Sequence, residues 1–404
     1  MALSNPSESP AVVVREIDLT GGVPNVQSST GATVFTSRWG TVEERVLVSN
    51  EEDLVDKFGA PDSAHTHAFH RANMFLKYTN KLQVVRVVDT TAKNAVSTTG
   101  QTASATPPAE VVKNETDFNS QLAALDSDSH TFVAKYPGQL GNSLQVSMCP
   151  HSANDSAFTQ WTFKGEFDAA PGTSDFATKN NGSNDEVHVV VADKSGKFTG
   201  TQGTVLERYA FLSLANNAKD ATGQNQFVKD VINENSKYVW LVGFDSDFSS
   251  TLGSKAAAGT ALDSGDNFTR TTGTTNTDKD FLFTQGVDGP NVTTGNLLTG
   301  YDLFEDKDQV EIDFLIAPGM TGRSDQTTVV NDLVTTAASL RKDCVVVASP
   351  ARSDIVNKTS ASDIVTNIVA TADTFTKSSY LIMDGNYLKV FDKFNDQFIF
   401  VPAN

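Results

Sequence analysis

Three histidines, His65, His67 and His70, lie close together and are the first candidate for a metal site. The surrounding residues predict a helix, in which successive side chains are rotated by about 100°. His65 then lies near the apolar edge of the helix, whereas His67 and His70 lie roughly 60° apart on the opposite face. A structural metal needs ligands that converge on one point. We therefore expect solvent-exposed histidines and no bound metal.

The segment Gly319-Met-Thr-Gly-Arg-Ser324 is a second candidate, because it follows a predicted strand and precedes a predicted helix. Free N–H groups at such a position bind phosphate in many α/β proteins. The segment has neither of the glycine patterns of nucleotide-binding loops, and the strand Cys344 to Ala348 ends in Ser-Pro instead of the acidic residue that binds a ribose. A turn in which Ser324 caps the next helix explains the segment better.

The remaining candidates also lack a complete motif. Asp-x-Asp pairs could bind calcium, but none continues into the glycine and distal glutamate of an EF-hand loop. We interpret them as turn and cap residues: Asp126/Asp128, Asp245/Asp247 and Asp306/Asp308. Cys149 and Cys344 lie in no motif that marks a nucleophile, and no Gly-x-Ser-x-Gly motif occurs. The residues predict no catalytic site, no cofactor and no metal, and therefore no enzyme.

Charge and composition exclude further classes of function. The formal net charge of −18 over 404 residues opposes binding to nucleic acid or to an anionic membrane. Met1 to Pro10 has no basic start followed by an apolar run, and no stretch reaches the ~18 apolar residues of a membrane span. We expect a protein that is made in the cytosol with reduced thiols, and that folds as two or three domains.

The elements that would position these residues begin with half of an α/β unit between Gly31 and Asp89. We expect strands at Ala32–Arg38 and Leu82–Val88, and a short helix at Glu51–Phe58 that Gly59 and Pro61 end. A second helix would have an apolar face made of Ala68, Ala72, Phe75 and Leu76.

A mixed block follows a Thr-, Ala- and Ser-rich linker that runs from Thr90 to Pro108. It is predicted to hold a helix near Phe118–Leu125, strands at Leu144–Met148, Val187–Ala192 and Tyr238–Gly243, a turn at Lys194–Lys197, and a helix at Gln226–Asn235. The Gly-, Ser-, Thr- and Ala-rich tract between Ser246 and Asp280 predicts an outer loop, because it offers little apolar area to bury.

The last block returns to the α/β pattern. Strands are expected at Val310–Ile316 and Cys344–Ala348, helices at Gln326–Arg341 and Ser362–Phe375, and a closing hairpin at Tyr387–Asp392 and Phe398–Val401. Strands flanked by such helices run parallel and are buried. The whole chain therefore predicts an α/β and α+β protein.

The first residues predict an extended arm. A stretch of apolar residues follows Pro10, and Gly21-Gly22 separates it from the next segment. Its apolar residues are Val12, Val13, Val14, Ile17 and Leu19. A terminal strand of this kind needs a sheet edge as its partner. Residue types alone leave open whether that edge belongs to the same chain or to a neighbouring subunit.

Several stretches resemble the tail sheath proteins of T-even-like contractile-tailed bacteriophages. They are Asn50–Pro61, Asn73–Tyr78, Leu82–Asp89, the turn Tyr136-Pro-Gly-Gln-Leu-Gly141, Arg341–Pro350 and Asp384–Asp396. They occur in the family's order and extend over nearly the whole chain.

The resemblance implies a virion protein, assembled in the host cytoplasm, that forms six-membered rings stacked helically around a tail tube. On a signal from the baseplate the sheath would contract and drive the tube through the host envelope without nucleotide hydrolysis. It also implies a discontinuous core domain, made of residues 24–89 and 290–404, with a mixed β-rich domain inserted at residues 90–289. Residues 1–23 would be an arm that pairs with a neighbouring subunit.

The sequence departs from the family's pattern in two places. Larger members have a protruding domain where this chain has only the linker from Thr90 to about Thr116, and the family continues beyond the hairpin into a C-terminal domain where this chain stops at Asn404. A truncated form and a natural short form both explain that end. The alternative functions are a nucleotide-binding α/β enzyme and a carbohydrate- or receptor-binding virion protein, for which the sequence offers no aromatic platform.

Overall fold

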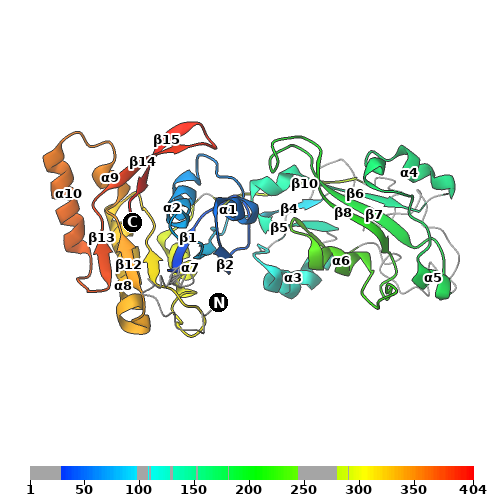
Figure 1. Cartoon of the computed structure of the whole chain (residues 1–404), viewed down its shortest axis with the longest axis horizontal. Helices are drawn as coiled ribbons and strands as arrows, with labels where there is room; N and C mark the ends of the chain where they lie inside the picture. The colour runs from blue at the N-terminus through cyan, green and yellow to red at the C-terminus, as the bar shows by residue number, and fades with distance from the viewer. Residues whose placement is uncertain are drawn as a thin grey trace, which may run out of the picture.

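The computed structural model describes residues 29–97, 108, 111–127, 131–151, 153–180, 182–243, 280–289 and 291–404. Figure 1 shows two units side by side along the long axis, one around each of two large sheets. The predicted arm residues and nearly all of the tract between Ser246 and Asp280 lie outside the described residues. Among the described residues, no helix is long and apolar enough to cross a membrane.

The first unit is a six-stranded sheet of order β13-β12-β11-β1-β3-β2. Its strands come from both ends of the chain: β1 Gly31–Phe35, β2 Arg45–Val48, β3 Leu82–Arg86, β11 Phe314–Ile316, β12 Val345–Ala348 and β13 Leu381–Met383. All neighbours are parallel except β2, which pairs antiparallel with β3. The central strand β1 pairs with β3 on one side and with β11, almost three hundred residues later, on the other.

Helices cover both faces of this sheet. On one face, α1 Glu51–Phe58 and α2 Thr66–Leu76 bury Leu54, Phe58, Phe69 and Ala72 against β1 and β3. On the other face, α7 Thr294–Asp302 and α8 Arg323–Thr335 bury Leu297, Tyr301, Val330 and Leu333. Gly300 lets α7 approach closely, because a Cβ there would lie 2.6 Å from Val34. α9 Arg352–Ile355 and α10 Ala361–Thr374 follow β12.

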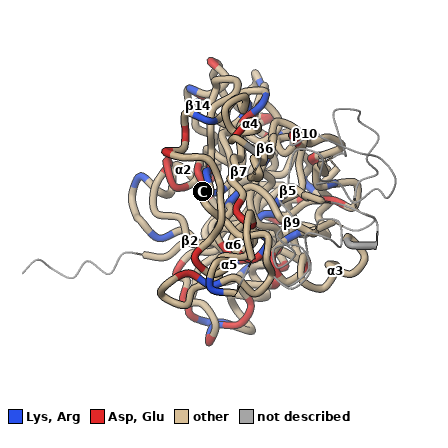
Figure 2. Tube along the Cα trace, turned by 90° about the vertical axis from the view of Figure 1, so that its right-hand side faces the viewer, with Lys and Arg blue, Asp and Glu red and all other residues tan. Residues whose placement is uncertain are grey.

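The second unit is a seven-stranded antiparallel sheet of order β8-β7-β6-β10-β4-β5-β9. Its strands are β4 Asn94–Ser97, β5 Phe132–Pro137, β6 Leu144–Pro150, β7 Glu186–Asp193, β8 Thr204–Ser213, β9 Val239–Leu241 and β10 Asp280–Thr284. The helices are α3 Glu115–Ser127, α4 Ser156–Gln160, α5 Asp175–Lys179 and α6 Val228–Asn235. The core includes Met148, Val189, Ile232 and Phe281. Figure 2 looks from the side of this unit and shows Lys and Arg interspersed among Asp and Glu.

The chain ends in a hairpin of β14 Tyr387–Asp392 and β15 Gln397–Pro402. One face of the hairpin packs on the first unit, where Ile399 and Val401 are buried.

Most elements with a clear periodicity occur where the sequence predicts them. α1 has the predicted bounds, and Gly59 ends it with a φ of 77°. Three details are wrong. The linker predicted from Thr90 to Pro108 contains β4, Asn94–Ser97, a buried strand inside the second sheet. The helix predicted at Gln326–Arg341 begins at Arg323 and its last turn, Thr336–Arg341, is a π-helix. Its N-cap is Gly322, without a side-chain cap bond, so Ser324 is not the cap residue.

Candidate functional site at the junction of the two sheets

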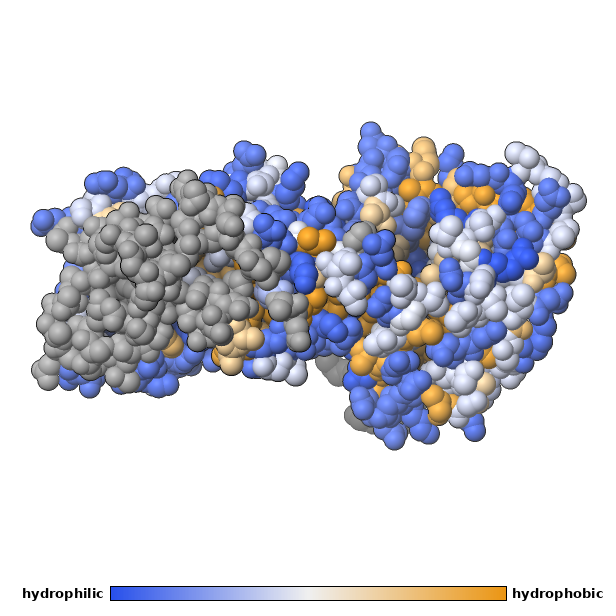
Figure 3. Space-filling model, turned by 180° about the vertical axis from the view of Figure 1, so that it is seen from behind, coloured by the Kyte–Doolittle hydropathy of each residue, from blue (hydrophilic) through white to orange (hydrophobic). Residues whose placement is uncertain are grey.

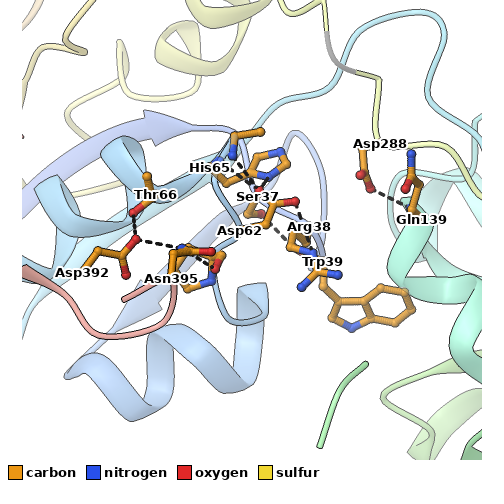
Figure 4. Close-up of polar contacts among 12 residues, drawn as sticks. Ser37, Arg38, Trp39, Asp62, His65, Thr66, Gln139, Asp288, Asp392 and Asn395 are labelled. Carbon is orange, nitrogen blue, oxygen red and sulfur yellow. Dashed lines mark hydrogen bonds and ion pairs between the residues drawn. The ribbon is translucent and has the colours of Figure 1, made fainter. Parts of the chain in front are cut away.

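The loop that follows β1 belongs to the first unit and packs against the second. In this loop the Ser37 hydroxyl donates to the Trp39 carbonyl at 2.8 Å, and the Trp39 N–H donates to the Phe58 carbonyl at 3.2 Å. The Trp39 side chain then leaves the first unit and enters the core of the second. Figure 4 shows Ser37, Arg38 and Trp39 between the two units.

Two aromatic rings of the second unit contact the Trp39 side chain. Its ring lies 5.4 Å from Tyr136 and 5.1 Å from Phe198, both in edge-to-face geometry, and only 3% of the residue is exposed. Edge-to-face pairs of this kind add about 0.5–1.5 kcal/mol each to the burial of the ring. A side chain from one unit is thus part of the other unit's core.

Arg86, the last residue of β3, makes the second connection. Its guanidinium donates to the carbonyl oxygens of Ser37 at 3.1 Å, Gly40 at 2.7 Å and Pro137 at 2.8 Å, and the residue is fully buried. Burial lowers the pKa of Arg86 to about 9, which still leaves it charged at neutral pH. The first two carbonyls belong to the loop of the first unit, whereas Pro137 ends β5 of the second unit.

Close backbone contact completes the junction. Gly138 has a φ of 142°, and a Cβ there would lie 2.6 Å from the Arg38 carbonyl oxygen. The Asp288 carboxylate accepts from the Gln139 N–H at 2.6 Å, as Figure 4 shows. Exposed ion pairs such as Lys237–Asp56, at 3.0 Å, add little because water screens them.

A cavity of about 420 Å³ lies beside the junction. Residues from both units line it, including Trp39, Lys57, Lys135, Tyr136 and Tyr238. Burial lowers the pKa of Lys135, whose ammonium lies 4.2 Å from the Trp240 ring and donates to the Ser236 carbonyl. The lysine is thus held by its own unit and is not directed at a ligand.

A second polar cluster fastens the hairpin to α2. Asp392, at the end of β14, accepts from the Thr66 hydroxyl at 2.5 Å and from the Asn395 amide at 2.7 Å, and its carboxylate lies 3.1 Å from His70 Nε2. Figure 4 shows Asp392 between Thr66 and Asn395. Burial raises the pKa of this carboxylate, but the hydrogen bonds outweigh that effect. They hold the pKa of Asp392 well below its usual range.

The prediction of solvent-exposed histidines is therefore wrong, because His65 and His67 are half-buried and His70 is buried. His70 is buried, with 4% of its surface exposed, because the hairpin covers this face of α2. His65 precedes α2 and pairs with Asp62 at 2.7 Å, a hydrogen bond that lowers the pKa of Asp62 to about 2. Within the described residues, no group of three or more His, Cys, Asp or Glu side chains could hold a metal ion.

The phosphate position considered at the carboxyl ends of β11 and β12 is filled by Pro402 and Asn404 of the same chain. The Asn404 amide donates to the carbonyls of Ala317 and Val347, at 2.9 Å each. A Cβ on Gly319 would lie 3.0 Å from the Pro402 ring. The Met320 N–H donates to the Gln326 side chain at 2.8 Å instead of facing solvent.

The other candidates have structural partners. Arg323 makes a bidentate pair with Asp354, at 2.9 Å for each bond. Asp306 accepts from the Asp308 N–H at 2.9 Å, as expected for a turn residue. Both cysteines are buried and free, and burial raises the pKa of Cys344 to about 11, so it is a thiol and not a nucleophile at neutral pH. The other two Asp-x-Asp pairs lie wholly or partly outside the described residues.

Comparison with known proteins identifies one class of relatives. No family model matches the chain. Over 206 residues, 51% of the chain, it is 36% identical to the tail sheath protein of Salmonella phage ViI, of which the match covers 29%. It is 24% identical to the tail sheath protein of Enterobacteria phage T4 over 98% of the chain and 71% of that relative. A tail sheath protein of Vibrio phage KVP40 is 39% identical over 88 residues.

Solved structures of sheath tail proteins from Listeria innocua and Desulfitobacterium hafniense are also similar. They cover 87% and 97% of this chain, and the chain covers 57% and 59% of them. Their TM-scores of 0.41 and 0.44, at 14% and 11% identity, are too low to support an argument about the fold. The chain is thus similar to the tail sheath proteins of bacteriophages, as its sequence motifs predict. Among these relatives, the T4 protein is the one that aligns along nearly all of this chain.

Proposed function

We propose that this protein is a structural subunit of a contractile phage tail sheath. The observation that carries the proposal is the alignment with the T4 tail sheath protein, which spans 98% of this chain. In the proposed role the chain self-associates into six-membered rings that stack around a tail tube, with the tube and the baseplate as further partners. The location is the virion, after assembly in the host cytoplasm.

The domain division predicted from the sequence is part of the proposal. Residues 24–89 and 290–404 would form one discontinuous core domain, and residues 90–289 the inserted domain. Two observations support it: β1, β2 and β3 share a sheet with β11, β12 and β13, and all strands from β4 to β10 lie in the other sheet.

The proposed role requires that force applied to one unit reaches the other. Trp39 and Arg86 support this requirement, since each belongs to the first unit and is buried against the second. The buried Arg86 guanidinium, with its three carbonyl acceptors, and the inserted Trp39 indole resist both separation and rotation of the units. Contraction would then draw on contacts between subunits that are stronger in the contracted sheath than in the extended one.

The inter-subunit arm remains part of the proposal. Val12, Val13, Val14, Ile17 and Leu19 would form a strand that pairs with a neighbouring subunit, where main-chain hydrogen bonds provide the contact. Deletion of residues 1–20 should give a folded monomer that no longer makes tubes. Normal tube assembly by the deletion variant would reject the arm without rejecting the sheath role.

Electron microscopy of the purified protein tests the proposed function directly. We expect tubes or rings at high protein concentration and monomers at low concentration. A protein that stays monomeric at all concentrations would reject a self-assembling sheath subunit.

The alternative of a nucleotide-binding α/β enzyme has a separate test. Pro402 and Asn404 occupy the crevice at the strand ends, which argues against it. ATP or GTP turnover that is lost in Ser324→Ala would establish the enzyme in its place.

A further inference from the structure

The cavity between the two units has both aromatic and polar walls. Its volume of about 420 Å³ lies within the ~300–1,000 Å³ of small-molecule sites, which occur preferentially between domains. Trp39 and Phe58 line it from the first unit, and Tyr136 and Tyr238 line it from the second. The molecular surface narrows between the two units, as Figure 3 shows from behind. These rings come from distant segments of the chain, so the sequence alone offers no aromatic platform here.

Two phenol hydroxyls at the cavity have no hydrogen-bond partner within the described part of the chain. They belong to Tyr136 and Tyr238, which are half-buried and whose rings lie 5.4 Å and 6.3 Å from the Trp39 ring. Neither hydroxyl oxygen is among the buried polar atoms that lack a partner, so both are accessible to a ligand. Burial raises the pKa of Tyr136 and that of Tyr238 to about 12, so both phenols are neutral at physiological pH. Each can therefore donate and accept a hydrogen bond.

The lysines at the cavity are already held by groups of the same chain. Lys57 pairs with Asp53 at 2.8 Å, and Lys237 pairs with Asp56 at 3.0 Å. Lys135 is held by a carbonyl and an aromatic ring of its own unit. A phosphate or carboxylate would thus find no free cation among the described residues that line the cavity. The same three lysines outnumber the two carboxylates of the lining, which disfavours a cationic ligand.

Two further acceptors lie at the C-terminal end of α6, where it borders the cavity. The Glu234 carboxylate is exposed and has no partner among the residues that the structure describes. The Asn235 side chain uses its N–H to donate to the Val231 carbonyl at 2.8 Å, which leaves its oxygen free to accept. The free groups at the cavity are thus phenols, a carboxylate and an amide oxygen beside aromatic rings. A sugar ring, with hydroxyl groups on its rim and C–H groups on its faces, is complementary to both kinds of group.

We propose that this cavity binds a neutral sugar, a mono- or disaccharide whose ring packs on Tyr136 and Tyr238. The two phenol hydroxyls pair with hydroxyl groups of the sugar, and Glu234 accepts from another. A ligand that contacts both units binds the joined form alone and therefore stabilises the junction. The inference adds a binding site to the proposed sheath role and does not depend on that role, because it uses only the walls of the cavity.

Saturation-transfer NMR with neutral sugars tests the site. The probes are glucose, galactose, N-acetylglucosamine and maltose, of which at least one should bind saturably at millimolar concentration. The double variant Tyr136→Phe/Tyr238→Phe should weaken this binding about tenfold or more, because it removes both hydroxyls and keeps both rings. Tyr78→Phe, at a tyrosine that is 92% exposed and does not line the cavity, is the matched control and should bind like the wild type. Circular dichroism checks that each variant is folded.

Hydrogen exchange of the wild-type protein locates the bound sugar without any substitution. The sugar should slow exchange in residues 39–41 of the first unit and in residues 234–238 of the second, because it contacts both. The site is overturned if no probe binds saturably, if a bound sugar leaves exchange in both ranges unchanged, or if the double variant binds as tightly as the control. Displacement of the sugar by inorganic phosphate would overturn its assignment to neutral ligands. Each of these results leaves the sheath role intact.

Discussion

The guanidinium of Arg86 in one sheet donates to the carbonyl oxygen of Pro137 in the other, with 2.8 Å between nitrogen and oxygen. Among the residues that the structure describes, the acceptors of this buried arginine are all main-chain carbonyls and none is a carboxylate. Its charge is therefore used to fix backbone positions on both sides of the junction.

Replacing Arg86 should weaken the contact between the two units and lower the free energy of unfolding. Arg86→Met leaves three buried carbonyls without donors, and each lost partner costs about 1–3 kcal/mol. We expect the free energy of unfolding to fall by ~3 kcal/mol or more. Urea denaturation measures this, and Arg208→Met, at a largely exposed arginine, should change it by less than about 0.5 kcal/mol. Equal stability of both variants would contradict the assigned role.

Trp39 should contribute mainly through packing. Trp39→Ala removes a side chain that is 3% exposed, and such changes cost about 3–5 kcal/mol. Trp39→Phe keeps an aromatic ring and should lose less. Limited proteolysis should cut the alanine variant first at the junction between the units, and an unchanged cleavage pattern would show that the indole does not hold them together.

Asp392 should hold the hairpin on α2. In Asp392→Ala the Thr66 hydroxyl and the Asn395 amide lose their acceptor, and His70 loses its neighbouring carboxylate. Hydrogen exchange should become faster in residues 387–402 while the seven-stranded sheet stays protected. Asp396→Asn, in the hairpin turn, is the control that keeps the cluster and suits the positive φ of 50° at this position. Uniform protection in both variants would show that apolar contacts alone dock the hairpin.

Stability should depend on pH through His188. Its Nδ1 accepts from the Phe211 N–H at 3.0 Å and its Nε2 donates to the Ala169 carbonyl at 2.9 Å, so the ring is neutral. Burial lowers the pKa of His188 below 6.5, against the opposing effect of the Ala169 bond. Below pH 6.5 the unfolded chain binds a proton that the folded chain does not, so this contribution to stability is complete above 6.5 and is lost as the pH falls.

The comparison of urea denaturation at about pH 7.5 and pH 5.5 isolates this group. Wild-type protein should lose more stability than His188→Gln over that interval, although the variant is less stable at both. A wild-type curve that runs parallel to that of the variant would contradict the prediction.

Local patterns were sufficient to predict most of the elements. The 3.6-residue repeat of Ile364, Val365, Ile368 and Val369 located α10, and the glycine and proline after Phe58 located the end of α1. These signals lie within one segment, so no distant partner is needed to interpret them.

Contacts between distant segments were not predictable in the same way. His70 is buried only because a hairpin more than three hundred residues later packs on α2, so helical periodicity alone gave the wrong exposure. Two signals at the junction did exist. Arg86 is a charge inside the apolar run Leu82–Val88, and Trp39 is a large aromatic residue next to a glycine in a loop. Neither signal identifies its partner, because the Pro137 carbonyl and the Phe198 ring belong to the other unit.

The pairing of β1 with both β3 and β11 has a consequence for synthesis. A ribosome makes Arg86 and then the entire seven-stranded sheet before it reaches Phe314. At about 5–20 residues per second, the first half of the sheet waits for roughly ten seconds or longer with one edge of β1 unpaired. During that time the edge could pair with a second nascent chain. Cells that make this protein in quantity therefore depend on early α1–α2 packing or on a chaperone to protect the edge until β11 arrives.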